Sequence, residues 1–262
     1  MIDIGANLTH KSFRKDENEV MQRALNAGVN TMIVTGSAVE ETEQAAEICA
    51  RYPDNLYFTS GVHPHLAKDC EEKTIPALKQ LATHKKCVAI GETGLDYNRN
   101  FSPIADQRRC FEAQLSLAVE LGMPVFMHER DAHDDFVDIL TPYLEHLPAT
   151  VIHCFTGNEN ELKKYIDMDL HVGITGWICD ERRGFHLRDI IHLIPSNRLM
   201  IETDAPYLLP RDLKPKPKDR RNEPSFLPHI VDTIAQVLGK TSSTIIDETS
   251  ATARTFFQLN NL

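Results

Sequence analysis

Eight short runs of apolar, β-prone residues recur along the chain, and they begin near Ile2, Thr31, Leu56, Cys87, Pro124, Thr150, Leu170 and Leu199. Successive runs start 20 to 37 residues apart, which leaves room for one strand, one helix and two loops in each unit. The runs are apolar on both faces, a pattern typical of parallel strands that are covered on both sides. We therefore expect a parallel sheet with a helix after each strand.

Amphipathic patterns fill the segments between these runs. In residues 12–27, Val20, Met21, Ala24 and Leu25 share one helical face, and Gly28 follows where a glycine often ends a helix. Further helices are expected over 38–50, 74–84, 105–121, 132–145, 158–168, 184–193, 226–238 and 243–258. Eight strand–helix units predict a (β/α)8 TIM barrel that forms a single domain over residues 1–262. A doubly wound open sheet is the alternative that this pattern leaves open.

Composition excludes several other classes of protein. Hydrophobic residues make up 42% of the chain and charged residues 25%, so a disordered or fibrous chain is excluded. No apolar run approaches the roughly 18 residues that a membrane span needs, and the opening residues lack the pattern of a secretory signal. The six cysteines are scattered without a C-x-x-C pair, which favours reduced thiols. We expect a cytoplasmic monomer with no membrane partner.

The net charge of −10 argues against a broadly basic surface for nucleic acid. It remains compatible with a nuclease that uses a bound metal and one local basic patch. Such a patch occurs in residues 211–221, within an irregular stretch of about 205–225 that is rich in Pro, Lys and Arg and follows the eighth run. We expect this stretch to lie over the mouth of the barrel.

Polar residues of metal-ligand type follow several of the predicted strands. Glu92 ends the fourth run, His128 the fifth and His153 the sixth, while Asp204 follows the eighth. In a TIM barrel these strand ends meet at one rim, where catalytic groups lie. Imidazole and carboxylate ligands suit a divalent metal that activates water and polarises a phosphoryl or carbonyl oxygen. Cys154 is expected to point away from this site, and Asp204 could also act as a general base.

Several motifs along the chain together resemble the TatD family of metal-dependent DNases. They are G-V-H-P-H, G-E-T-G-L-D-Y, V-F-M-H-x-R, H-C-F-T-G, G-I-T-G-W, E-T-D-A-P-Y-L and R-R-N-E-P. The resemblance implies an amidohydrolase-like TIM barrel, a divalent metal and hydrolysis of phosphodiesters in nucleic acid. The segments D-I-G-A-N-L-T and T-G-W-I-C-D-E-R-R-G are similar to the branch of 3′–5′ exonucleases that act on single-stranded DNA and RNA. The family also suggests a role in DNA repair or nucleic-acid turnover.

The resemblance assigns roles residue by residue. Glu92, His128, His153 and Asp204 match the metal ligands. Glu92, Asp204 and His63 match catalytic residues, and His63 corresponds to a histidine near the scissile phosphate. Many family members begin with D-x-H-x-H, but Gly5 and Asn7 replace both histidines here. This loss of nitrogen ligands favours Mg over Zn, with Mn tolerated.

Further residues are candidates for contacts with single-stranded DNA or RNA. Arg130 could grip a phosphate or pair with Asp131 or Glu129, and Trp177 could stack on a base or pack at the rim. His65 could bind metal or hold His63 in place. Arg221 and Asn222, from the R-R-N-E-P motif, are the remaining candidates for phosphate contacts.

Two other functions remain open from the sequence. One is an amidohydrolase-type metallohydrolase that acts on amide, lactone or cyclic urea bonds with the same barrel. The fourth run ends in Glu92, whereas many such enzymes place a metal-bridging lysine there, which argues against that subtype. The other is a binding protein whose catalytic site decayed when the first histidine pair was lost, although four candidate ligands remain.

Overall fold

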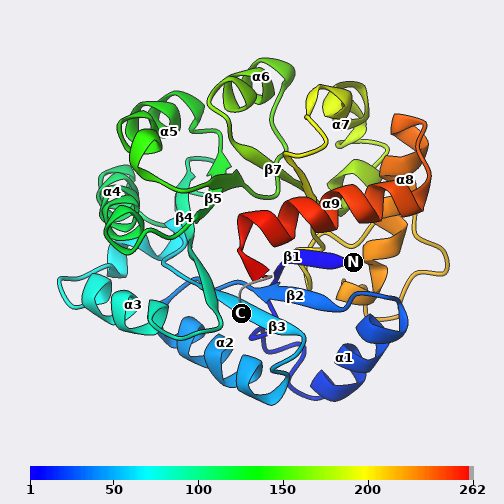
Figure 1. Ribbon diagram of the computed structural model, residues 1–262, viewed down its shortest axis with the longest axis horizontal. Helices are drawn as coiled ribbons and strands as arrows, with labels where there is room; N and C mark the ends of the chain where they lie inside the picture. Colours follow the sequence, from blue (N-terminus) through cyan, green and yellow to red (C-terminus); the bar gives the residue numbers. More distant parts are fainter. Residues whose placement is uncertain (260–262) are drawn as a thin grey trace.

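The computed structural model describes residues 1–259, and eight parallel strands form its centre (Figure 1). Each strand is hydrogen-bonded to the next in chain order. The strands are β1 (Ile2–Ala6), β2 (Thr31–Val34), β3 (Leu56–Ser60), β4 (Cys87–Asp96), β5 (Val125–Arg130), β6 (Thr150–Ile152), β7 (His171–Ile174) and β8 (Leu199–Ile201). A parallel bridge between Ala6 and Ala205 brings the segment after β8 back to β1, so the sheet curls into a barrel. The TIM barrel is thus confirmed, and the open sheet is excluded.

Helices surround this barrel, as Figure 1 shows. They are α1 (Glu17–Asn26), α2 (Val39–Arg51), α3 (Thr74–Ala82), α4 (Ile104–Leu121), α5 (His133–Leu140), α6 (Glu159–Asp167), α7 (Phe185–Ile190), α8 (Leu227–Leu238) and α9 (Ser242–Phe256). Gly122 ends α4 in the left-handed conformation, which glycine adopts without a steric cost. Short 3₁₀ helices follow α5 and α7, so the regular helices end earlier there than the sequence pattern predicted.

The first helix also begins later than predicted, at Glu17 instead of residue 12. The preceding residues form successive tight turns, in which the Phe13 amide donates to the His10 carbonyl and the Asp16 amide to the Phe13 carbonyl. Phe13 is buried and anchors these turns. The turns matter for the site because they place Asp16 beside the loop that follows β8.

The last helix closes one end of the barrel. Phe256 and Phe257, at the end of α9, pack against the interior side chains of the strands, among them Ile2, Ile33 and Phe126. Figure 1 shows α9 lying across this end, beside β1. The amino ends of the strands are therefore covered, and only the carboxyl ends remain for a substrate to approach.

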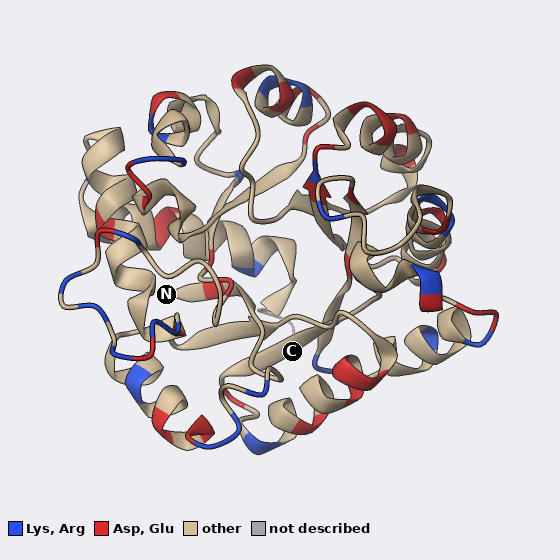
Figure 2. Ribbon diagram, turned by 180° about the vertical axis from the view of Figure 1, so that it is seen from behind, with Lys and Arg blue, Asp and Glu red and all other residues tan. Residues whose placement is uncertain are grey.

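Part of the irregular stretch 205–225 lies at the barrel mouth, where Tyr207 and Leu208 line a cavity. The basic part, 211–221, does not line that cavity, which corrects the expectation for those residues. Arg211, at its start, pairs with Glu181 at 2.9 Å, and Arg221, at its end, pairs with Asp16 at 2.6 Å. Both ends are thus tied to the outer part of the barrel, and the stretch lies at the side, near α8 (Figures 1 and 2). Within residues 1–259, no helix has both the length and the apolar character needed to cross a membrane.

Candidate active site

A cavity of about 620 Å³ opens at the carboxyl ends of the strands. Eight of the ten predicted site residues line it: His63, His65, Glu92, His128, Arg130, His153, Trp177 and Asp204. A groove of about 630 Å³ lies elsewhere, between α2 and α3, so volume alone does not identify the site. The convergence of titratable side chains from separate strands distinguishes the first cavity.

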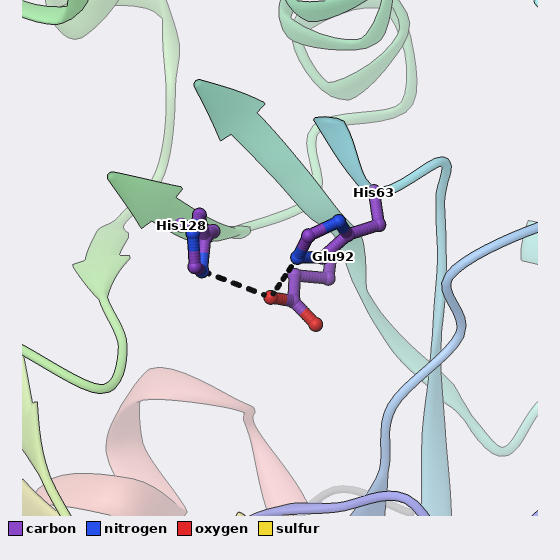
Figure 3. A group of neighbouring side chains, drawn as sticks. All are labelled: His63, Glu92 and His128. Carbon is purple, nitrogen blue, oxygen red and sulfur yellow. Dashed lines mark ion pairs between the residues drawn. The ribbon is translucent and has the colours of Figure 1, made fainter. Parts of the chain in front are cut away.

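Glu92 lies at the centre of the cavity floor with three histidines around one of its oxygens. Glu92 Oε1 is 2.8 Å from His153 Nε2, 3.2 Å from His63 Nε2 and 3.3 Å from His128 Nδ1. Figure 3 shows His63 and His128 approaching this oxygen from different sides, with Glu92 between them. The sequence places the four residues on different runs, and the barrel brings them together.

Two further carboxylates hold these histidines in place. His153 Nδ1 lies 3.2 Å from Glu202 Oε2, so its ring is held between Glu92 and Glu202. Asp96 Oδ2 lies 2.7 Å from His65 Nε2 and 3.3 Å from His128 Nε2. Carboxylates that orient imidazoles in this way are a common feature of metal sites. The sequence motifs contained both Asp96 and Glu202, but neither was singled out, because their role depends on distant partners.

Glu202 also explains why the chain departs from the family pattern at residue 5. Glu202 is completely buried, and it accepts a hydrogen bond from the Cys154 amide at 2.5 Å. A β-carbon on residue 5 would lie 2.3 Å from Glu202 Oε2, and one on residue 173 would lie 2.6 Å from Oε1. Gly5 and Gly173 therefore make the space that Glu202 fills, and a histidine at position 5 would collide with it.

Asp204 enters the cavity wall on a segment that is fixed on both sides. The Asn7 amide donates to Asp204 Oδ1 at 2.9 Å, and the Asp204 amide donates to the Gly5 carbonyl at 2.8 Å. The neighbouring Thr203 donates from both its amide and its hydroxyl to Asp3. Asn7, which replaces a histidine of the family pattern, thus orients a candidate ligand through its side chain.

The electrostatics of the floor favour ionised groups in a buried place. Burial by itself raises the pKa of Glu92, but the positive charge of His153 and hydrogen bonds from His128 and His153 hold it well below its usual value. Burial by itself lowers the pKa of His153, but Glu92 and Glu202 hold it well above its usual value. Burial, with the charges of Glu92 and Glu202, raises the pKa of Asp204 to about 7 against the opposing effect of His153.

The donor set fits a divalent metal ion. His63, Glu92 and His128 offer ligand atoms that all lie within 4.8 Å of one another. His128 Nε2 is buried and makes no hydrogen bond to the described residues, although Asp96 lies near it. Imidazole and carboxylate groups in this combination suit Mg, Mn or Zn.

Cationic and aromatic side chains stand around this floor. Arg130 lines the cavity and forms no ion pair within residues 1–259; Glu129 instead accepts hydrogen bonds from Tyr165 and the Ala132 amide. The pairing of Arg130 with Glu129 or Asp131 is therefore not observed. Arg99 is a second cation in the wall, and unlike the half-buried Arg130 it is exposed; no motif of the sequence indicated it.

Three aromatic rings form the rim of the cavity. Trp177 is half-buried beneath the guanidinium of Arg183, 4.4 Å from the ring centre, and its Nε1 makes no hydrogen bond to the described residues. Phe101 and Tyr207 are 59% and 52% exposed, which is unusual for large apolar rings. Neither was singled out from the sequence, because nothing local distinguishes an exposed aromatic residue from a core one.

Arg221 and Asn222 do not line this cavity. The Arg221 side chain is 11% exposed and lies among Asp16, Glu223 and the Ser12 carbonyl. Asn222 is completely buried and donates to the Thr203 and Tyr207 carbonyls at 2.9 and 2.7 Å. The structure thus gives both residues internal partners, while their predicted contacts with a substrate stay a prediction.

Cys154 corrects another expectation, because it faces the cavity that His153 also lines. The expectation of opposite directions assumed an extended backbone with alternating side chains. At Cys154 the backbone φ is +49°, so this alternation ends directly after His153. His65 lies beside His63, and its amide donates to His63 Nδ1 at 3.0 Å, which orients that ring.

Comparison with known proteins adds independent evidence. The family model for TatD related DNase matches residues 2–258. The chain is 49% identical over 260 residues to a protein of Escherichia fergusonii named 3′-5′ ssDNA/RNA exonuclease TatD, and the match covers 99% of this chain and 100% of that protein. The crystal structure of a hydrolase TatD family protein from Entamoeba histolytica superposes with a TM-score of 0.90 at 27% identity, covering 98% and 97% of the two chains.

A structure described as an uncharacterised amidohydrolase from Saccharomyces cerevisiae has the same fold. It superposes with a TM-score of 0.86 at 24% identity and covers 98% of this chain and 99% of that one. At this level of identity the likeness concerns the fold alone. The amidohydrolase alternative thus shares the architecture, whereas the relatives that share half of the residues carry the name of an exonuclease.

Proposed function

Because this chain belongs to the family of TatD-related DNases, we propose that it is a metal-dependent 3′–5′ exonuclease on single-stranded DNA and RNA. The observation that carries the proposal is the arrangement of Glu92 among three histidines on the floor of a cavity at the strand ends. Five carboxylates line that cavity against two arginines. Such a cavity repels a polyanion until a divalent cation is bound.

We assign Glu92, His128, His153 and Asp204 as the residues that hold this cation. When bound, the ion supplies a Lewis acid for the phosphoryl group and lowers the pKa of water. We favour Mg, with Mn as a substitute and Zn as a poorer one, because carboxylate oxygens dominate the wall and Asn7 replaces a histidine. Glu202 and Asp96 orient the ligating imidazoles, so their role is positioning.

The protein's own groups carry the remaining steps. Asn7 engages Asp204 Oδ1, and Oδ2 makes no hydrogen bond within the described chain, which leaves it to accept a proton from the attacking water. His63 Nε2 faces Glu92 Oε1 at 3.2 Å, and it can donate its hydrogen bond to the scissile phosphate instead once that oxygen binds the cation. Arg130 and Arg99 can hold the phosphate through charge-assisted hydrogen bonds. The water oxygen bonds to phosphorus as the P–O bond to the leaving nucleotide oxygen breaks, and that oxygen takes up a proton from solvent. No covalent bond to the enzyme forms.

The rim supports a preference for single strands. Stacking of a base on an aromatic ring contributes about 1–3 kcal/mol and needs an unpaired base. Phe101, Tyr207 and Trp177 offer such rings around a cavity of about 620 Å³, which holds a strand end and no duplex. Phe101 lies edge-on to His65 at 4.8 Å, so its ring is close to the reactive centre.

The test is digestion of oligonucleotides labelled at the 5′ end, with a chelated enzyme resupplied with Mg, Mn or Zn. We expect a ladder that shortens from the 3′ end on single strands in Mg or Mn, and little cleavage of a blunt duplex. If the labelled 5′ nucleotide were released as the first product, digestion would run from the 5′ end, which would contradict the proposed 3′–5′ direction. Activity restored by Zn alone would contradict the assignment of Mg. Hydrolysis of amides or lactones without any cleavage of oligonucleotides would contradict the proposed exonuclease activity.

A matched pair of variants isolates the rim. Phe101→Ala should raise KM for single strands by roughly 5-fold to 100-fold, as expected for one lost stacking contact. Phe185→Ala is the control, because Phe185 is 54% exposed but lies outside the cavity. An equal effect of both substitutions would show that Phe101 does not contact the strand.

We further propose that the chain works as one domain over residues 1–262 and as a monomer in the cytoplasm. Within residues 1–259 the exposed large hydrophobic side chains are limited to Phe101, Ile104, Phe185 and Tyr207, which supports a monomer. All six cysteines are free thiols, which suits a reducing compartment. Light scattering behind a sizing column checks the monomer, for which the expected mass is 29.7 kDa.

A further inference from the structure

A second group of ligating side chains lies outside the cavity. Cys179, Asp212 and His229 each offer one ligand atom, and these atoms all lie within 4.8 Å of one another. Cys179 ends the 3₁₀ helix Gly176–Cys179 after β7, Asp212 lies in the loop after β8, and His229 lies in the first turn of α8. Three segments of the chain therefore meet at one point.

The contacts within the group leave one side open to water. His229 Nε2 is 2.6 Å from Asp212 Oδ1, and the Cys179 thiol donates to the Thr233 hydroxyl at 3.3 Å. The side chains of Asp212 and His229 are 40% and 30% exposed, whereas Cys179 is completely buried. Arg188 lies 3.8 Å from the other Asp212 oxygen and can orient that carboxylate.

We propose that Cys179, Asp212 and His229 form a separate site for one divalent cation of the zinc class, with water as the fourth ligand. A thiolate, an imidazole and a carboxylate are the ligand types that zinc binds in a tetrahedral arrangement. A sulfur ligand also disfavours Mg, so this site selects a different ion from the catalytic cavity. The assignment is independent of the proposed exonuclease activity.

Binding at this site exchanges protons for the ion. Burial raises the pKa of the Cys179 thiol to about 12, so the thiol is protonated in the absence of metal and donates to Thr233. Coordination replaces that proton, which leaves to solvent, by a bond to the cation. A role of Cys179 as a nucleophile is excluded, because its side chain is 0% exposed and no substrate can reach it.

The site would connect part of the cavity wall to the outer part of the barrel. Trp177, on the cavity rim, lies two residues before Cys179 in the same 3₁₀ helix. Asp212 lies at the start of the basic stretch 211–221, whose lysines 214, 216 and 218 form no ion pairs within residues 1–259. A bound ion therefore links the Trp177 rim, the basic stretch and α8 in one cross-link.

Metal content and a spectroscopic signature test the site directly. Chelated protein is loaded with Co²⁺, which reports a thiolate ligand by a charge-transfer band in the near ultraviolet. We expect the band in the wild type and in Cys154→Ser, whose thiol lies in the catalytic cavity. We expect its loss in Cys179→Ser. A band that survives in Cys179→Ser, or that is lost in Cys154→Ser, overturns the proposal.

Because Cys179→Ser alters a buried residue and could misfold, two variants of partly exposed residues test the same site. His229→Gln and Asp212→Asn change partly exposed side chains and should bind one equivalent of Zn²⁺ fewer than wild type, measured by mass spectrometry of the metal after gel filtration. Zn²⁺ should also slow tryptic cleavage within 211–221 in wild type and leave the rate in His229→Gln unchanged. Equal zinc content in wild type and both variants, or equal protection in His229→Gln, overturns the proposal.

Discussion

Replacement of Asn222 by alanine separates an internal role of this residue from contact with the substrate. The Asn222 side chain donates to the Thr203 and Tyr207 carbonyls and accepts from the Glu223 amide at 3.0 Å. It is completely buried, so water cannot replace these partners after truncation. The substitution therefore leaves three backbone groups without their partner.

The magnitude follows from these contacts. Each intramolecular hydrogen bond contributes about 1 kcal/mol net, and more when a buried group is left unpaired, so the loss is about 3 kcal/mol. That is a large fraction of the free energy of unfolding of a typical protein, which is roughly 5–15 kcal/mol. Because Thr203 and Tyr207 flank Asp204, the same loss loosens a residue of the candidate active site. We expect kcat to fall more than KM rises.

Urea unfolding and steady-state kinetics of Asn222→Ala measure both effects. Asn160→Ala is the control, because Asn160 is exposed on α6. The free energy of unfolding of this variant should lie within about 0.5 kcal/mol of that of wild type. If Asn222→Ala has the same free energy of unfolding as the control but a raised KM, Asn222 does not act by holding the Thr203 and Tyr207 carbonyls. In that case the contact with substrate predicted from the R-R-N-E-P motif is the correct explanation.

Three shorter predictions use other parts of the structure. Glu92→Gln should reduce turnover by at least about 100-fold while retaining cooperative unfolding, and retention of activity would exclude it as an essential ligand. Gly5→Ala should cost about 1–3 kcal/mol in urea unfolding, because its β-carbon would meet buried Glu202; an unchanged midpoint would contradict the close packing. Burial and the charge of Arg198 lower the pKa of His171 to about 4. Protonation of this histidine therefore favours the unfolded state, and the free energy of unfolding should fall by up to about 3 kcal/mol as the pH drops from 6.5 to 4. Unfolding of His171→Gln, compared with wild type at several pH values, should show a shallower fall over that range, and parallel curves would contradict it.

Much of the architecture could be predicted from local patterns. Each expected strand begins within one residue of the observed one, because parallel strands covered on both sides produce continuous apolar runs. The strand ends then indicated His128, His153 and Glu92, since carboxyl ends meet at one rim in a barrel. The start of the first helix could not be predicted from the local pattern. The helix begins at Glu17 instead of residue 12, because the residues before it form turns anchored by buried Phe13.

The roles of the supporting residues depended on contacts between distant parts of the chain. Arg221 has the composition of a phosphate-binding residue, yet Asp16, 205 residues away, pairs with it. Asn7 and Asp204 are 197 residues apart, and Asp3 and Thr203 are 200 apart. No local pattern encodes such pairs, and an arginine or asparagine has the same sequence signature whether its partner is substrate or protein.

The sequence by itself determined the order of strands and helices, the end of the barrel that carries the chemistry, and the residue types that meet there. The tertiary structure decided which of these groups touch. It placed three histidines around one oxygen of Glu92, and it filled the space above Gly5 with Glu202. The physical reason is that periodic burial is a local property of the chain, whereas the geometry of a site depends on barrel closure, which brings β1 and the segment after β8 together.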